Sequence, residues 1–167
     1  MVERSAIWSA MTAAQVLFFA FLIGVFAGLR SLAPAAVIAW AGHLGWLRVQ
    51  SPLAWLGSLP AAIVLTLLAS AELISDKLPK TPSRTAPPGL IARLAMGAFC
   101  GAAVCLAGAQ SGLAGAVVGA IGGIVGCFGG YQLRTRLVKA LGTPDYAVAV
   151  LEDVVAIGGS LLVVSRF

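Results

Sequence analysis

Residues 94–133 read LAMGAFCGAAVCLAGAQSGLAGAVVGAIGGIVGCFGGYQL, a run of 40 residues without a charge between Arg93 and Arg134. About 20 apolar residues cross the hydrocarbon core of a bilayer as an α-helix, so this run is long enough to cross twice. The polar sequence Gln-Ser-Gly at residues 110–112 interrupts it near the middle. The run therefore predicts a hairpin of two membrane helices with its turn at that interruption.

The composition of the whole chain also indicates a membrane protein. Of the 167 residues, 60% are hydrophobic and 10% are charged, and the mean hydropathy is +0.99. Soluble domains are roughly 45–50% apolar and about 25% charged. The net charge of +5 does not indicate nucleic-acid binding, because the Lys and Arg residues lie between apolar runs, as in the cytoplasmic loops of membrane proteins. We expect a single all-α membrane domain over residues 1–167 and no nucleic-acid partner.

Six apolar segments can be marked, and we expect five of them to span the membrane. They are residues 12–29, 31–47, 59–78, 90–109, 112–133 and 145–165. The second has only 17 residues and contains Pro34, so we expect it to be interfacial or re-entrant. Charge does not decide this point, because eight Lys and Arg residues lie inside and three outside whether or not the second segment crosses.

Two short matches indicate an internal repeat. Residues 23–29 (IGVFAGL) resemble 125–131 (VGCFGGY), and residues 71–76 (AELISD) resemble 151–156 (LEDVVA). The alternative is that these are chance matches, which a glycine-rich apolar chain offers in number.

Both matches relate helices of opposite orientation only if the second segment does not cross the membrane. In that case the amino terminus lies inside, and the halves 12–78 and 112–165 form an inverted repeat linked by the helix at 90–109. Inverted repeats of this kind are typical of transporters and channels.

Small residues recur at four-residue spacing, as in Gly115, Gly119 and Gly123. Helices in a bilayer associate through close backbone contact, so this spacing favours tight packing inside a bundle over a pore lining. A homodimer seam is a further interpretation of the same residues.

Four of the six acidic residues fall within or at the edge of apolar segments: Glu72, Asp76, Glu152 and Asp153. A carboxylate at the bilayer centre costs roughly 2.5–3.5 kcal/mol on insertion scales, so it needs water, a partner or a proton. Glu72 and Asp76 are four residues apart and share one helix face. We expect these four acids to form an ion or proton site that is open to the cytoplasm. Three basic residues are expected to balance its charge: Arg30, Lys77 and Arg134.

Two other interpretations of the charged residues stay open. The acids can instead form structural salt bridges that lock the bundle, as in a membrane scaffold. Alternatively, Lys80, Arg84 and Arg93 of the proline-rich loop can contact anionic lipid head groups. The leading hypothesis is a small transporter or channel-like protein, a homodimer among membrane lipids, that moves a small ion or solute.

Enzyme chemistry has no support in the sequence. It contains no HExxH, GxSxG, P-loop or paired-cysteine motif, so we expect no enzyme activity, no cofactor and no metal. His43 lies near three tryptophans, which is typical of an aromatic belt at the outer interface: Trp40, Trp46 and Trp55. Three cysteines in apolar runs are expected to be free thiols: Cys100, Cys105 and Cys127.

Four stretches together resemble a known family. They are GLRSLAP at 28–34, AELISDKLPK at 71–80, PSRTAPPG at 82–89 and EDVVAIGG at 152–159. The chain resembles the small bacterial inner-membrane proteins of domain-of-unknown-function family 4126, and the resemblance covers nearly its whole length. It implies a multi-pass protein of the bacterial inner (plasma) membrane and supplies no catalytic residue.

Overall fold

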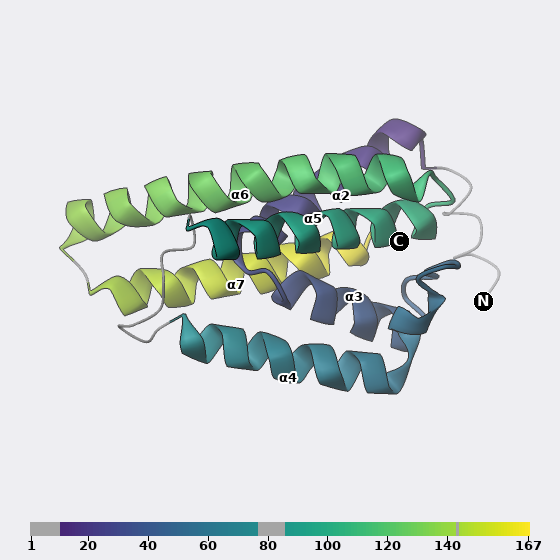
Figure 1. Ribbon diagram of the computed structural model, residues 1–167, viewed down its shortest axis with the longest axis horizontal. Coiled ribbons are helices and arrows are strands. Elements are labelled where there is room, and N and C mark those ends of the chain that lie inside the picture. The colour runs from purple at the N-terminus through teal and green to yellow at the C-terminus, as the bar shows by residue number, and fades with distance from the viewer. Residues whose placement is uncertain (1–10, 77–85, 143) are drawn as a thin grey trace.

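The computed structural model describes residues 11–76, 86–142 and 144–167, and these ranges contain six α-helices and no strand. The helices are α2 (Ala13–Leu29), α3 (Ala33–His43), α4 (Leu59–Ser75), α5 (Pro87–Ala107), α6 (Gly112–Leu141) and α7 (Asp145–Val164), with a short 3₁₀ helix, η1 (Ala54–Gly57), before α4. They form one elongated bundle (Figure 1). The predicted all-α helical bundle is confirmed.

Among the described residues, three helices are long and apolar enough to cross a membrane by length and composition: α5, α6 and α7. Helices α2 and α4 are apolar but have 17 residues each, and α3 has 11. At about 1.5 Å per residue, 17 residues reach about 25 Å, less than the roughly 30 Å of a hydrocarbon core. The prediction of five spanning helices is therefore wrong.

Local signals set the helix starts where the sequence places them. The Ser58 hydroxyl accepts a hydrogen bond from the Ala61 N–H (3.3 Å), and Pro60 lies in the first turn of α4. The Ser111 hydroxyl accepts from the Ala114 N–H (3.4 Å) at the start of α6. Both serines are N-caps, which satisfy backbone donors that a helix start leaves open. The predicted turn at residues 110–112 is confirmed.

Helix α6 is longer than expected, with 30 residues. The basic residues that we expected in a loop after residue 133 lie on its last turns: Arg134, Arg136 and Lys139. The helix continues because no proline or glycine interrupts residues 131–141, and it ends at Gly142, whose φ of 60° is left-handed.

Glycines bring α2, α5 and α6 into backbone contact. A Cβ atom added to Gly24 of α2 or to Gly97 of α5 would collide with the backbone of Gly119 in α6. A Cβ atom on Gly28 would collide with Gly123 and its neighbours further along α6. The predicted tight packing is confirmed, and this glycine surface is used within the chain. As predicted, three cysteines lie outside any disulfide in the described part of the chain, and all of them are buried: Cys100, Cys105 and Cys127.

The same contacts fix the helix directions. Because Gly24 lies against Gly119 and Gly28 against Gly123, α2 and α6 run parallel. The expected inverted repeat, with the amino terminus inside, needs these two helices to run in opposite directions, so it is not confirmed. Helix α7 runs antiparallel to α2: the Phe19 ring near the start of α2 contacts the ring of Phe167 beyond the end of α7, whereas Arg30 at the end of α2 contacts Asp153 in the first half of α7.

Helix α3 reverses the chain inside the bundle. The Trp40 Nε1–H donates to the Thr66 hydroxyl (2.9 Å), and the start of α3 contacts Glu72, so α3 and α4 are antiparallel. Most of α3 is buried, including Ala35 and Ala39 at 0% exposure. The segment is therefore a core helix that returns to the end where α2 begins, and it does not lie along a surface.

Candidate functional site

The turn between α2 and α3 is buried and carries charge. Helix α2 ends at Arg30, whose backbone is extended, and α3 begins at Ala33 with Pro34 in its first turn. Proline cannot continue a preceding helix, because it lacks an N–H group and restricts the residue before it. The break places Arg30 and Ser31 inside the protein, with exposures of 0% and 7%.

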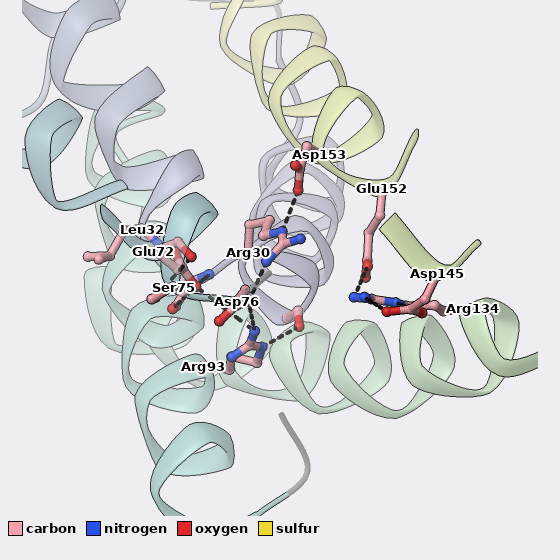
Figure 2. A network of polar contacts seen from close by, with 12 residues as sticks. Arg30, Leu32, Glu72, Ser75, Asp76, Arg93, Arg134, Asp145, Glu152 and Asp153 are labelled. Carbon is pink, nitrogen blue, oxygen red and sulfur yellow. Dashed lines mark hydrogen bonds and ion pairs between the residues drawn. The ribbon is translucent and has the colours of Figure 1, made fainter. Parts of the chain in front are cut away.

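Arg30 is the centre of a group of charges that we name the Arg30 cluster, together with Glu72, Asp76, Arg93 and Asp153. Its Nη1 forms an ion pair with Asp76, at the end of α4, and its Nε lies 2.6 Å from an Asp153 oxygen in α7 (Figure 2). Its Nη2 is buried and has no hydrogen-bond partner among the described residues. Arg30 thus joins the α2–α3 turn to α4 and α7.

Arg93 extends the Arg30 cluster to α5. Its Nε donates to the Gly28 carbonyl (3.0 Å), one of the carbonyls left open at the end of α2. Its Nη2 donates to Asp76 at 3.3 Å and lies 3.9 Å from Glu72. Arg93 is 5% exposed and lies inside the network, whereas we expected it at the membrane surface; its contact with a lipid head group stays a prediction. The other two predicted head-group residues, Lys80 and Arg84, lie outside the described residues.

Glu72 caps α3 from a neighbouring helix. Its Oε1 accepts from the Ser31 N–H (2.8 Å) and the Ser31 hydroxyl (2.5 Å), and its Oε2 accepts from the Leu32 N–H (2.8 Å). The N-cap residue Leu32 has no side-chain acceptor of its own. A carboxylate at a helix N-terminus is also stabilised by the helix dipole. Glu72 therefore holds the start of α3 to α4.

Glu152 lies in a second group, the Arg134 cluster, with Arg134 and Asp145. Arg134 binds Asp145 at the start of α7 through Nε (2.8 Å) and Nη2 (2.5 Å), and its Nη1 lies 3.6 Å from Glu152 (Figure 2). Glu152 and Asp153 point in different directions because successive helix residues are about 100° apart. Among the described contacts, three of the acids thus lie in the Arg30 cluster and Glu152 lies in the Arg134 cluster, and the expected ion or proton site stays a prediction.

The sequence-predicted residues are thus mostly paired with one another. The expected charge-balancing residues Arg30 and Arg134 do bind the acids, whereas Lys77 lies outside the described residues. Sequence reasoning missed Asp145, although an acid in the first turn of a helix is a recognisable signal. Within the described ranges, no three His, Cys, Asp or Glu side chains are placed to hold a metal ion.

These features define a class: helical membrane proteins with a charged cluster buried at an internal helix turn. The chain belongs to the family described as "Domain of unknown function (DUF4126)", whose sequence model matches residues 17–165. That match includes every residue of both clusters. We found no match to the chain among curated proteins or solved structures.

Proposed function

We propose that the protein is a small transporter or channel-like membrane protein that binds a proton or a cation at the Arg30 cluster. The observation that carries the proposal is the buried turn at Arg30, where two short antiparallel helices meet five charged groups. Transporters place substrate and ion sites at such interrupted helices. Non-helical backbone at membrane depth is tolerated where protein buries it or where it lines a cavity.

The chemistry of the cluster favours a proton over a metal cation. Its three carboxylates alternate with the guanidinium groups of Arg30 and Arg93, so a metal ion would sit close to positive charge. Protonation of Glu72 would weaken its hydrogen bonds to Ser31 and Leu32, because these donors favour the charged carboxylate. Proton uptake would then loosen the α2–α3 turn, which couples binding to movement.

A specific observation favours a second candidate, a non-catalytic membrane scaffold. The guanidinium groups of Arg30 and Arg93 bind carboxylates from other helices, and Glu72 already caps α3. Such pairs can serve only to hold helices together. This candidate predicts that loss of the pairs lowers stability without a transport defect.

Assembly and location are part of the proposal. A chain with three candidate spans is small for a transporter, so we propose a homodimer in the bacterial inner membrane. The proposal includes no catalytic step and no cofactor. Mass measurement of the purified protein in nanodiscs tests the dimer, and a monomer would contradict it.

Flux through proteoliposomes tests the function directly. We would load vesicles with a pH-sensitive dye, impose a potential and measure proton and alkali-cation flux for the wild type, Glu72→Gln and Asp153→Asn. Glutamine keeps the length of Glu72 and one acceptor oxygen but cannot ionise. We expect flux in the wild type and background rates in both variants.

The matched control is Asp145→Asn, which removes a carboxylate from the Arg134 cluster, where the side chain is 64% exposed. This variant should retain wild-type flux. Equal flux in all variants, or none in the wild type across the ions tested, would contradict the transport proposal. Lower melting temperatures in Glu72→Gln and Asp153→Asn with unchanged flux would support the scaffold.

A further inference from the structure

Helix α4 lies at the edge of the bundle, and most of its surface is exposed (Figure 1). Among the described residues it packs mainly against α3 and η1, and only Ala62 and Ala69 of its 17 residues are buried. Its exposed side chains are mostly large and apolar, with exposures of 65% at Leu67 and 66% at Ile74. In a membrane protein, such a face is covered either by acyl chains or by another protein surface.

Two exposed polar side chains on α4 are bonded to the helix itself. The Thr66 hydroxyl donates to the Ala62 carbonyl (2.7 Å), and the Ser70 hydroxyl donates to the Thr66 carbonyl (2.8 Å). Lipid tails offer no hydrogen-bond partner, so polar groups in their midst must be satisfied within the protein. Helix α4 also contains no glycine, whereas the close contacts of α2, α5 and α6 depend on glycines. These features favour acyl chains over a second protein surface beside α4.

The exposed apolar face of α4 is shorter than that of α6. On α4 it extends from Leu59 to Ile74, which is about 22 Å along the helix. On α6 it extends from Leu113 to Leu133, which is about 30 Å. The face of α4 ends next to Asp76, which belongs to the Arg30 cluster and has a side chain that is 22% exposed. Tilt would only reduce the height of α4 further, so the two edges of the bundle match hydrocarbon layers of different thickness.

We infer that α4 binds phospholipids with short acyl chains, so that the bilayer beside α4 is about 8 Å thinner than the bilayer beside α6. A hydrocarbon core of roughly 30 Å matches α6, but beside α4 it would bring acyl chains against the exposed carboxylate of Asp76. The free-energy cost of mismatch grows with each Å, so it sorts lipids by chain length. The inference does not depend on the transport proposal.

Fluorescence quenching by brominated lipid measures which lipids lie beside each helix. We would replace the three native cysteines with alanine and attach a bimane label at Leu67→Cys, in the middle of α4, or at Ile121→Cys, near the middle of the exposed face of α6. Both positions are exposed, Leu67 by 65% and Ile121 by 50%. The full-length protein is reconstituted in brominated dioleoylphosphatidylcholine mixed with an unbrominated phosphatidylcholine that carries dimyristoleoyl, dioleoyl or dierucoyl chains.

The preference for chain length should differ between the two labels. At Leu67→Cys, we expect the short dimyristoleoyl lipid to displace the brominated lipid about fivefold more strongly than the dioleoyl lipid does. The long dierucoyl lipid should be the weakest competitor there. At Ile121→Cys, the matched control, the dioleoyl lipid should compete at least as well as the dimyristoleoyl lipid.

Two results would overturn the inference. The first is the same chain-length preference at both labels. The second is a label at Leu67→Cys that brominated lipid does not quench, which would mean that another protein surface covers α4.

Native tryptophans keep the test decisive if a labelled variant fails to fold. A protein with the single change Trp8→Phe retains three tryptophans, which lie in α3 and in its connection to α4: Trp40, Trp46 and Trp55. Their quenching should show the preference for dimyristoleoyl lipid that is expected at Leu67→Cys. Equal competition by the three lipids at these tryptophans would overturn the inference as well.

Discussion

The Arg30 and Arg134 clusters contain the same kinds of side chain but differ in burial and in the helices that they join. The Arg30 side chain is 0% exposed, and its cluster joins the α2–α3 turn to α4, α5 and α7. The Arg134 side chain is 17% exposed, and within the described residues its ion pairs join α6 to α7. Exposed ion pairs contribute little, whereas removing one partner from a buried pair is costly. The difference indicates that place in the fold, more than residue type, decides which ion pairs hold this bundle.

The largest expected effect comes from removing Arg30, and removing Arg134 gives the comparison. Arg30→Met should lower the free energy of unfolding by about 3–5 kcal/mol, because it removes the positive charge between buried carboxylates. Arg134→Met should cost less than Arg30→Met, because Asp145, the acid that Arg134 binds most closely, is 64% exposed. Thermal unfolding in detergent, followed by circular dichroism, measures both. Equal losses of stability in the two variants would contradict the difference between the two clusters.

An intermediate effect is expected at Glu72, where the charge acts on the backbone. Glu72→Ala leaves the Ser31 and Leu32 N–H groups without their acceptor, which costs about 1–3 kcal/mol. Amide hydrogen exchange should become faster at the start of α3 and stay unchanged in α6.

The matched variant at this position is Glu72→Gln, which keeps an acceptor oxygen and should lose less stability than Glu72→Ala. If the alanine variant exchanged its α3 amides as slowly as the wild type, the capping role of Glu72 would be wrong.

The smallest effect is expected at Asp145. Asp145→Asn weakens an ion pair whose acid is 64% exposed, so the loss should be about 0–1 kcal/mol. Salt screens exposed charges, so the difference between wild type and variant should shrink further at high ionic strength. Melting temperatures at low and high salt measure it, and a large, salt-independent loss would show that the Arg134 cluster is as structural as the Arg30 cluster.

Sequence reasoning located the important acids but not their grouping. Glu72, Asp76, Glu152 and Asp153 were recognisable because carboxylates are costly in apolar segments. Their separation into two clusters depends on the rotation of α7 about its axis, which places Asp153 beside Arg30 and Glu152 beside Arg134. Neighbours in sequence share a depth in the membrane, but they do not share a helix face.

Arg93 shows a similar limit. It stands at the edge of the long apolar run, next to a proline-rich loop, so it looks like a residue of the membrane surface. In the fold it reaches the Gly28 carbonyl and Asp76. That carbonyl is available only because α2 ends inside the bundle, which hydropathy does not reveal.

The sequence by itself determined that this is an all-α membrane protein, where the hairpin of α5 and α6 turns, and that glycines pack its helices. These properties follow from local composition and spacing, which act on each segment separately. Only the tertiary structure decided that α2 and α6 run parallel and that α3 returns through the core. Both depend on how helices contact one another, and in an apolar, glycine-rich chain many pairings look alike until charges such as Arg30 and Glu72 select one.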